Sequence, residues 1–439
     1  MTDQRTRVLA ALGIEALKPM QAAAEEAIQP GTDTFLVSPT GSGKTLGFLL
    51  PVLQLLKSEQ AGIQCLVLVP SRELAMQIEG VWRKMATGYK VNVCYGGHPV
   101  ETEIKNLSNP PALLIGTPGR IADHLTRRSF ATDTIQTLVL DEFDKSLTLG
   151  FHEEMHYIID NLPNLQTRVL ASATSGIAIP DFIDLHNPTT LRFDADEDVP
   201  AALALKVVYT DKADDREALF RLLCTLGSEA ALIFCNLRDT VEQLSTYLNS
   251  KGLYGTAYHG ALEQADRERA LIRFRGGSVT YLITTDLAAR GLDIPDMQHV
   301  IHYELPPHET EFTHRNGRTA RMHATGTAYI LLPRADPAPF YLRNELDELT
   351  LPAKTPALPA PPDYTTVYIS GGKKNKINKV DIVGFFGQKG ALAKDDIGRI
   401  EVGDFMAFVS IRRTSVDALL SRIQNEKMKG KKYKIEIAR

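Results

Sequence analysis

The stretch SPTGSGKT, residues 38–45, holds two glycines beside a lysine and a threonine. It follows the apolar run TFLV and opens a helical pattern, which is the context that a phosphate-binding loop requires. The glycines let backbone N–H groups approach phosphate oxygens, Lys44 adds positive charge, and the Thr45 hydroxyl can ligate Mg²⁺. These residues predict a nucleotide site, and a glycine-rich turn between strand and helix is the alternative.

A second stretch, HRNGRTAR at residues 314–321, offers three arginines at fixed spacing. It lies far enough along the chain to belong to another domain. Together the two stretches predict a nucleotide held between two domains. One domain would bind the phosphates, and the other would complete the site on closure.

Length and composition limit the class of protein. A chain of 439 residues is too long for one ordinary core and fits two or three domains. Its 44% hydrophobic and 23% charged residues are typical of globular proteins. No apolar run approaches the roughly 18 residues of a membrane span, and the N-terminal residues lack the apolar core of a signal peptide. We therefore expect a cytoplasmic protein with no membrane contact, and no obligate protein partner is evident.

The four cysteines, Cys65, Cys94, Cys224 and Cys235, show no CxxC pairing and lie mostly in apolar runs. This pattern favours buried reduced thiols over disulfides or a zinc site.

The net charge of −4 conceals a division along the chain. Residues 364–439 carry 16 Lys and Arg against 8 Asp and Glu, whereas the rest of the chain carries 33 against 45. A basic segment after an acidic body indicates a polyanionic partner for that segment.

Short β-rich apolar runs alternate with helical patterns from residue 34 onward. Continuous apolar strands separated by helices predict a parallel sheet covered on both faces. The pattern restarts after an acidic stretch at residues 193–202, so we expect a second α/β domain of similar design. The expected strands are TFLV, CLVLV, VNVCY, ALLIG, TLVLDE and RVLASAT in the first domain, and KVVYT, ALIFCN, GTAYHG, TYLITTD, HVIHYE and GTAYILL in the second.

The sequence changes character beyond residue 333. YLRNELDEL, residues 341–349, is expected to form a helix, and five prolines in residues 352–362 predict a semi-rigid tether. Residues 364–439 then follow the order strand, helix, strand, strand, helix, strand, which is the split-βαβ pattern of small α+β, RRM-like domains. We expect a first domain at residues 1–195, a second at 202–335, a linker at 336–363 and the RRM-like domain at 364–439.

DEFD, residues 141–144, ends the strand TLVL at the carboxyl edge of the first sheet, where ligands of open α/β sheets bind. Adjacent carboxylates are unfavourable there without a cation or hydrogen bonds. Asp141 would hold Mg²⁺ and Glu142 would orient and deprotonate an attacking water, with a solvated turn as the alternative. SAT, residues 172–174, follows the next strand. Its hydroxyls could bond Asp144, although an ordinary turn explains this tripeptide as well.

These residues resemble the DEAD-box RNA helicases. SPTGSGKT, PSRELAMQ (70–77), the pair Gly96 and Gly97, TPGR (117–120), DEFD and SAT occur in the order and spacing of that family. The second domain continues the match with LIFCN, QADR (264–267), TTDLAARGLDIP (284–295) and HRNGRTAR. The resemblance covers about residues 12–335 and implies two RecA-like domains with ATP bound between them.

The resemblance also implies the residues of an ATP and Mg²⁺ site. Those expected to act in catalysis are Lys44, Asp141, Glu142, Arg318 and Arg321, the last two by contacting the γ-phosphate. Thr45 and Asp141 would hold Mg²⁺, and the residues expected to couple the motifs are Asp144, Ser172 and Thr174. The expected ATP-binding residues are Gln21, Thr40, Gly41, Ser42, Gly43, Lys44, Thr45 and Asp293, with Gln21 reading the adenine edge and Asp293 reaching the ribose.

RNA is the second ligand that the resemblance implies. Most contacts in the family go to phosphate and sugar, so the core would recognise RNA by its backbone and 2′-OH. Such binding bends one strand and separates a short duplex locally. The expected contacts are Arg72, Gly97, Thr117, Gly119, Arg120, Gln264, Arg267, Thr285 and Arg290. For each of them singly, a surface salt bridge or a loop glycine is the alternative.

Three positions depart from the family pattern, of which Ala320, in place of the usual glycine, is minor. Phe143 replaces the alanine of the DEAD motif, and we expect a locally repacked neighbour rather than lost activity. Ile14 stands where the family often has an aromatic residue before Gln21, which predicts weaker stacking on adenine.

The basic segment carries RNA-binding signals of its own. VYISGG, residues 367–372, has the shape of an RRM recognition strand with Tyr368 at a stacking position. The partner strand FMAFVSI keeps Phe408 but has Met406 where another aromatic is expected, so stacking on the sheet face is half supported. The lysines expected to bind RNA are Lys373, Lys374, Lys376, Lys429, Lys431 and Lys432, and a merely charged surface is the alternative.

GGKKNK, DIGRIEV and KMKGKKYKIEI are similar to the C-terminal domain of the DbpA group of bacterial DEAD-box proteins. That resemblance implies structured 23S ribosomal RNA and the pre-ribosomal large subunit as partners. The leading hypothesis is an RNA-dependent ATPase that unwinds short duplexes. An RNA chaperone or clamp with little ATP turnover is the alternative, and a DNA translocase is disfavoured by TPGR, SAT and the RNA-type tail.

Overall fold

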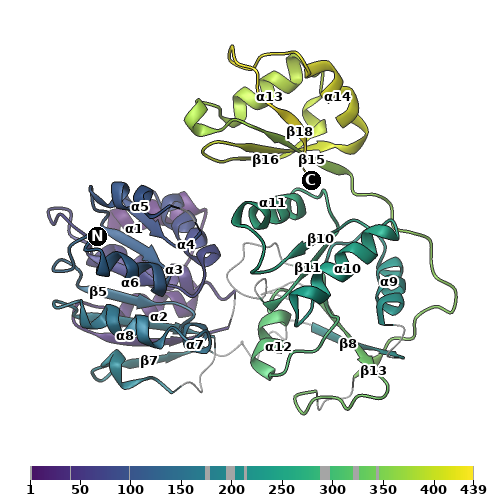
Figure 1. Ribbon diagram of the computed structural model, residues 1–439. Helices are drawn as coiled ribbons and strands as arrows, with labels where there is room; N and C mark the ends of the chain where they lie inside the picture. Colours follow the sequence, from purple (N-terminus) through teal and green to yellow (C-terminus); the bar gives the residue numbers. More distant parts are fainter. Residues whose placement is uncertain are drawn as a thin grey trace. The chain divides into compact units, whose positions relative to one another are not determined.

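The computed structural model describes residues 2–39, 41–97, 99–173, 178–193, 203–211, 215–286, 297–319, 326–342 and 346–438. The described chain divides near residue 200 into two compact units. Three sheets organise it: one parallel sheet in the first unit, and one parallel and one antiparallel sheet in the second (Figure 1). The predicted α/β fold with two parallel-sheet domains and a small α+β module is therefore confirmed.

The first sheet has seven parallel strands in the order β3-β4-β2-β5-β6-β1-β7. The six predicted strands are present, and a seventh, β7, was not predicted because it is short and largely exposed. The strands are β1 (Asp33–Val37), β2 (Cys65–Leu68), β3 (Val91–Cys94), β4 (Leu113–Gly116), β5 (Thr137–Leu140), β6 (Thr167–Ser172) and β7 (Thr189–Arg192).

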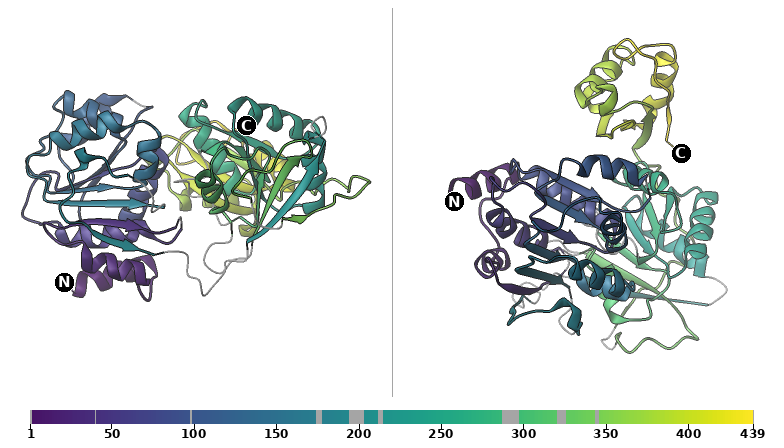
Figure 2. Two further views of the ribbon diagram at one scale, coloured as in Figure 1. Left: turned by 90° about the horizontal axis from the view of Figure 1, so that it is seen from below. Right: turned by 60° about the vertical axis from the view of Figure 1, so that its left-hand side comes forward.

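Helices cover both faces of this sheet, as the continuous apolar strands predicted (Figure 2, left). Neighbouring strand residues point to opposite faces. Leu36 packs with α2, α3 and α4, whereas Phe35 joins the cluster of α6, α7 and α8. The helices are α1 (Thr2–Leu12), α2 (Pro19–Ala27), α3 (Lys44–Leu55), α4 (Arg72–Lys84), α5 (Val100–Leu107), α6 (Pro118–Thr126), α7 (Phe143–Thr148) and α8 (His152–Asp160).

The second parallel sheet has the order β10-β11-β9-β12-β13-β8-β14. α9 and α10 pack on one face of it, and Phe312 of α12 packs against β8 and β13. The elements are β8 (Leu203–Thr210), α9 (Asp215–Leu226), β9 (Ala231–Phe234), α10 (Arg238–Ser250), β10 (Gly255–Tyr258), α11 (Gln264–Arg275), β11 (Tyr281–Thr284), β12 (His299–His302), α12 (Glu309–Asn316), β13 (Gly326–Pro333) and β14 (Asp347–Glu348).

The helix expected at residues 341–349 is wrong where the structure describes that segment. Asp347 and Glu348 form β14, which pairs in parallel with β8. The Leu349 N–H donates to the carbonyl oxygen of Val207, and Leu349 packs on the core of this sheet. Backbone groups of this segment thus form hydrogen bonds with the open edge of β8. In a helix the same groups would bond to one another.

The C-terminal module is a four-stranded antiparallel sheet of order β16-β17-β15-β18. Two helices pack on one face of it around Val367, Phe386 and Leu419. The predicted strand and helix order is confirmed: β15 (Tyr364–Ile369), α13 (Lys379–Gln388), β16 (Ile397–Val402), β17 (Ala407–Arg412), α14 (Val416–Ile423) and β18 (Ile435–Ile437).

All four cysteines are buried and unpaired, as predicted. Burial raises the pKa of the Cys65 and Cys235 thiols, so both stay protonated at neutral pH. No helix in the described part of the chain is long and apolar enough to cross a membrane.

Phe143, which departs from the family motif, is fully buried at the start of α7. It belongs to the apolar cluster that contains Met155 and Ile158 of α8. The large ring therefore fills core space at the start of α7.

Phe143→Ala, which restores the family's alanine, is expected to destabilise the first unit by about 3–5 kcal/mol because it leaves a cavity among these side chains. Chemical denaturation would measure the loss. Leu149→Ala, a truncation of a half-exposed side chain just beyond the same helix, serves as the control. A Phe143→Ala loss below about 1 kcal/mol would mean that the neighbours collapse into the space.

Candidate functional site

Three loops with candidate chemistry leave the first sheet at one edge. β5, β6 and β1 are neighbours, and parallel strands end on the same side of a sheet. The phosphate loop follows β1, the carboxylates of residues 141–144 follow β5, and Ser172 ends β6. The Ser38 N–H donates to the Ser172 carbonyl oxygen at 3.1 Å, so the entry to the phosphate loop is fastened to the end of β6.

Hydrogen bonds and a left-handed glycine hold the phosphate loop in a conformation that fits an anion. The Lys44 ammonium donates to the carbonyl oxygens of Ser38 and of Pro39, the latter at 2.9 Å. Gly43 has φ of 97°, a left-handed conformation that favours glycine. The Ser42 hydroxyl is buried with no hydrogen-bond partner among the described residues. A buried polar group in that state fits a ligand that supplies the missing partner, so these residues fit a bound phosphate.

Gln21 lies in α2 and contacts the phosphate loop directly. Its Nε2 donates to the Gly43 carbonyl oxygen at 3.2 Å, and its Oε1 accepts from the Lys18 N–H at 3.0 Å. A Cβ atom at position 43 would lie 2.6 Å from this Nε2, so Gly43 is needed for the contact as well as for its backbone angle. Ile14 packs against the core beside this helix.

Asp141 is a buried carboxylate at the end of β5. Burial raises its pKa to about 6, and the nearby Lys44 opposes part of that rise. Its Oδ1 accepts the Glu142 N–H at 2.9 Å. A divalent cation would stabilise a desolvated carboxylate at this edge, where the phosphate loop with Thr45 also leaves the sheet, so the residues fit Mg²⁺.

Glu142 follows with φ of 46°, in the left-handed region. Such a conformation costs a non-glycine residue about 1–3 kcal/mol and is retained where the surrounding structure holds it. Asp144 is buried two residues on, and Ser172 is fully buried at the neighbouring strand end. The surrounding structure therefore holds Glu142 in a conformation that its local preference does not favour.

Arg72 and Gly97, two of the expected RNA contacts, lie together. The Arg72 guanidinium donates to the Gly96 carbonyl oxygen at 3.4 Å. Gly97 has φ of 103°, and a Cβ atom there would lie 2.5 Å from Arg72 Nη1. The glycine pair therefore lets the backbone approach the arginine closely.

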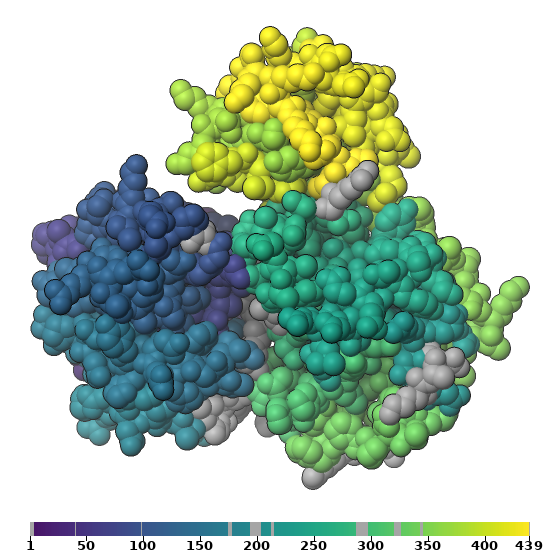
Figure 3. Space-filling view, viewed as in Figure 1, coloured from purple at the N-terminus to yellow at the C-terminus, as the bar shows by residue number. Residues whose placement is uncertain are grey.

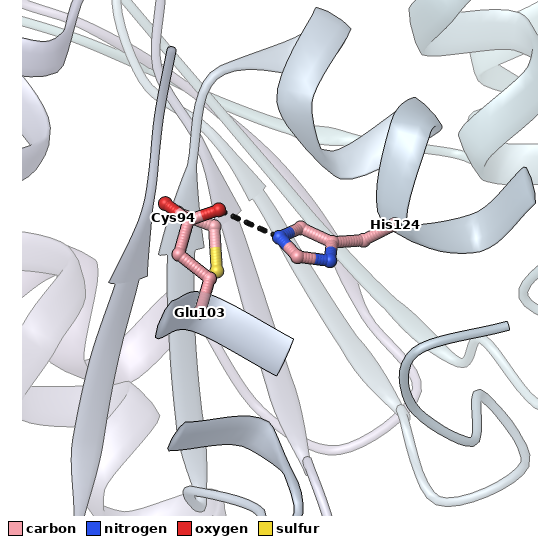
Figure 4. Close-up of side chains that lie close together, drawn as sticks. All are labelled: Cys94, Glu103 and His124. Atoms are coloured by element: carbon pink, nitrogen blue, oxygen red, sulfur yellow. Dashed lines mark hydrogen bonds and ion pairs between the residues drawn. The ribbon is translucent and has the colours of Figure 1, made fainter. Parts of the chain in front are cut away.

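A buried cluster supports Arg120, and the sequence motifs did not indicate it. Glu103 of α5 accepts from the backbone N–H of Tyr95 at 3.0 Å and bonds His124 Nε2 of α6 at 2.7 Å (Figure 4). Arg120 Nε lies 3.6 Å from the same carboxylate. Glu103 thus ties the segment that enters the glycine pair to the helix that begins after Thr117. Gly119 is exposed on that helix.

Cys94 completes the cluster in Figure 4, and the ligand atoms of Cys94, Glu103 and His124 lie within 4.8 Å of one another. Burial raises the pKa of the Cys94 thiol, which keeps it protonated. The Arg120 guanidinium already supplies a positive charge at the carboxylate. A metal cation would have to compete with both, so we interpret the cluster as a hydrogen-bonded support for Arg120.

α11 of the second unit begins with two of the expected RNA contacts. Gln264 opens the helix and donates to Glu268 at 2.8 Å, and Arg267 is buried one turn on. Thr285 follows β11, and its carbonyl oxygen accepts the Thr284 hydroxyl at 2.9 Å. These residues belong to one compact unit, and their contacts hold the helix start and the strand end in defined conformations.

Arg315, the first arginine of HRNGRTAR, is fully buried in α12. Its Nε and Nη2 bond both oxygens of Asp286, at 2.6 and 3.1 Å, and Nη2 also donates to Asn236 at 2.8 Å. Nη1 donates to the Glu304 carbonyl oxygen at 2.7 Å. With these partners Arg315 is a structural link between strand ends. Arg318, one turn on, is also buried.

The expected lysines of the C-terminal module lie at its surface. Lys373 and Lys374 begin the short 3-10 turn η3 (Lys373–Asn375), and both are exposed. The Lys429 ammonium donates to the Lys376 carbonyl oxygen at 2.8 Å, so the two lysine-rich segments meet. In the space-filling view the yellow C-terminal part of this module lies against its yellow-green N-terminal part (Figure 3). Lys431 and Lys432 are exposed on the same segment.

The sheet face of this module is largely covered. Tyr368 is half-buried, with its ring centroid 5.5 Å from that of the buried Phe408. Thr366 and Ser410 share this face by register and are buried, and the Thr366 hydroxyl bonds Ser278 within the same compact unit. Tyr368 borders a cavity of about 640 Å³.

Five of the expected site residues lie outside the part of the chain that the structure describes: Thr40, Thr174, Arg290, Asp293 and Arg321.

Family models match three consecutive parts of the chain. Residues 18–181 match the DEAD/DEAH box helicase model, residues 214–323 the helicase conserved C-terminal domain, and residues 366–437 the DbpA RNA binding domain. The ATP-dependent RNA helicase DbpA of Escherichia coli is 33% identical over 97% of this chain and 95% of its own length.

The chain belongs to the DEAD-box RNA helicases. It is an ATP-hydrolysing, ATP-dependent RNA helicase with a DbpA-type RNA-binding domain. The DEAD-box ATP-dependent RNA helicase CshA of Bacillus licheniformis is 32% identical over 76% of this chain and 69% of its own. The structure of Dbp5 of S. cerevisiae bound to RNA and ADP BeF3 superposes with a TM-score of 0.70, at 27% identity, over 79% of this chain and 93% of that one. The two parallel-sheet domains are RecA-like, as the resemblance implied.

Asp141→Asn is expected to stabilise the ligand-free helicase above pH 6. Folding raises the pKa of Asp141 from 3.8 to about 6. Between these values the native state binds more protons than the unfolded chain, so stability falls as pH rises through that window. Asparagine carries no charge and keeps an oxygen for the Glu142 N–H. In a metal chelator at pH 8, the variant should be more stable by up to about 3 kcal/mol.

Thermal unfolding across pH 4 to 8 checks this expectation, because most of the difference should disappear near pH 4. Asp239→Asn, at an exposed position on α10, is the control and should follow the wild type at every pH. A constant difference between Asp141→Asn and the wild type would show that the carboxylate charge is not its cause.

Proposed function

We propose that this helicase is an RNA-stimulated ATPase that separates short RNA duplexes locally. We further propose that its C-terminal module directs it to structured 23S ribosomal RNA during assembly of the large ribosomal subunit, and hence that it works in the cytoplasm. One observation carries the proposal. The same chain holds a strained carboxylate site at the sheet edge of a phosphate loop and, separately, a basic α+β module.

The chemistry is assigned to the carboxyl edge of the first sheet. Lys44 and the loop amides bind the phosphates, and Thr45 and Asp141 hold Mg²⁺, which neutralises phosphate charge when bound. Glu142 orients the attacking water and accepts its proton. Asp144, Ser172 and Thr174 couple the motifs of this sheet edge to one another. Gln21 reads the edge of the nucleotide base. Arg318, Arg321 and Asp293 would act on the nucleotide from the second domain.

RNA binding is assigned to two sets of residues. In the first domain Arg72, Gly97, Thr117, Gly119 and Arg120 contact the backbone, and in the second Gln264, Arg267, Thr285 and Arg290 do so. Contacts of this kind position RNA without reading sequence. The C-terminal lysines and Tyr368 then select the RNA, and attachment of this module to the core raises the local concentration of nearby duplex. We keep the division into residues 1–195, 202–335, 336–363 and 364–439 as a proposal that rests on the sequence pattern, although residues 347–349 of the linker pack on the second sheet.

The proposed ribosomal target rests on GGKKNK, DIGRIEV and KMKGKKYKIEI and on the excess of lysine and arginine in residues 364–439. A clamp with little ATP turnover is the second candidate. Phe143 and the lack of an aromatic residue before Gln21 both favour it. The Phe143 ring, however, is buried in the core. The burial therefore favours the ATPase.

Glu142→Gln is expected to lower RNA-stimulated ATP turnover by at least about 10²-fold because glutamine cannot accept a proton. Binding of ATP and RNA should persist, since the amide keeps the size of the side chain. ATP turnover would be measured with and without a fragment of 23S ribosomal RNA, and Glu153→Gln, an exposed change on α8, is the control. If RNA fails to stimulate the wild type, or if Glu142→Gln matches it, the ATPase proposal is refuted.

Lys373→Ala with Lys374→Ala should weaken binding of that ribosomal fragment and make it less sensitive to salt. Each lost phosphate contact lowers the slope of log affinity against log salt by about 0.7–0.9, so the double variant should lose about 1–2. Lys389→Ala with Lys394→Ala removes the same charge elsewhere in the module and should leave the slope nearly unchanged. Equal slopes in both double variants would contradict the prediction that Lys373 and Lys374 bind phosphates of the RNA.

A further inference from the structure

The turn between β16 and β17 presents a large apolar side chain to water. The Gly403 N–H donates to the Met406 carbonyl oxygen at 2.8 Å, which leaves Asp404 and Phe405 as the tip of the turn. Phe405 is 67% exposed. Leaving a phenylalanine in water forgoes about 1.5–3 kcal/mol of burial, and hairpin tips usually carry glycine, asparagine or aspartate. The exposed ring is therefore available to bind a ligand.

The first lysine-rich segment is fastened to this same turn through its backbone. The N–H groups of Lys373 and Lys374 donate to the carbonyl oxygens of Gly403 and Asp404, at 2.9 and 2.8 Å. Gly372 makes the approach possible, because a Cβ atom there would overlap the Gly403 carbonyl oxygen and lie 2.8 Å from the Asp404 carbonyl carbon. The backbone of two exposed lysines is thus held against the turn that carries the exposed phenylalanine.

The second lysine-rich segment reaches the same edge of the module. The Lys429 ammonium bonds the Lys376 carbonyl oxygen and lies 3.1 Å from Asp381 at the start of α13. The Tyr433 ring packs on Gly371, where a Cβ atom would lie 2.5 Å from it. Asp404 is the single carboxylate within residues 371–379 and 403–406, against four lysines. This edge combines positive charge with an open aromatic face.

The sheet face, where the sequence predicted base stacking, is less accessible than this edge. Phe408 is buried and Tyr368 is half-buried, whereas most of the Phe405 ring is open to solvent. An aromatic ring beside lysines is the combination with which proteins bind single-stranded nucleic acid, since bases stack on the ring and phosphates lie on the cations. The four lysines of residues 371–379 suit the phosphates of RNA.

We propose that Phe405 stacks on an unpaired base of RNA whose adjacent phosphates bind Lys373 and Lys374. The inference rests on the proposed RNA-binding role of the C-terminal module and assigns a site within it. The ligand is an unpaired nucleotide at a loop, bulge or strand end, and every base has a face that can stack. Phe405 contributes contact with the base, and the lysines contribute contact with the backbone.

The test uses the full chain without nucleotide and two fluorescent probes, a decaadenylate and a decamer of abasic ribose phosphates. Phe405→Ala should weaken decaadenylate binding about tenfold and leave abasic binding unchanged. Phe405→Trp should restore the affinity, and Phe405→Leu, which keeps an apolar side chain without a ring, should not. Lys373→Ala with Lys374→Ala should weaken both probes.

Phe340→Ala is the matched control, because Phe340 is a 62% exposed phenylalanine that lies outside the C-terminal module. It should bind both probes as the wild type does. Quenching of 2-aminopurine placed in the decaadenylate reports stacking directly, and it should fall in Phe405→Ala alone of the two phenylalanine variants.

The proposal is overturned if Phe405→Ala binds decaadenylate like the wild type, or if it loses affinity for both probes equally. Neither result depends on ATP turnover. Loss of RNA-stimulated turnover in the wild type would instead refute the proposed function and leave the stacking site standing.

Discussion

The parallel direction of β1, β5 and β6 is the constraint on which the active edge depends. Neighbouring parallel strands end on the same side, so the phosphate loop, Asp141 and Ser172 leave the sheet together. The bond from the Ser38 N–H to the Ser172 carbonyl oxygen fixes two of these ends to each other. Because the strands are buried on both faces, this arrangement is as rigid as the core itself.

That rigidity supports features that are unfavourable on their own. Burial raises the pKa of Asp141, and Glu142 adopts a left-handed backbone conformation. In a flexible loop, water would reach the Asp141 carboxylate and the Glu142 backbone would return to a more favourable conformation. Immediately after them, Phe143 packs in the core and anchors the start of α7.

The arginines of HRNGRTAR show how one motif can serve two purposes. Arg315 has no exposed surface, and its guanidinium is bound by Asp286, Asn236 and the Glu304 carbonyl oxygen. It joins the ends of β9, β11 and β12, which lie side by side in the sheet. Glu103 has a similar role beneath Arg120 in the first domain. In both places a buried partner positions a motif that is expected to work at the surface.

The sequence by itself determined the two parallel sheets, the order of elements in the C-terminal module and the position of the phosphate loop and DEFD after strands of the first sheet. Local signals suffice there, because apolar strand runs and glycine-rich turns depend on neighbouring residues. Only the tertiary structure decided that residues 347–348 pair with β8, that Arg315 is buried, that Glu103 supports Arg120, and that Phe405 is held beside Lys373. Each of these depends on groups far apart in the chain, and their pairing is settled by burial and hydrogen bonding that no local pattern records.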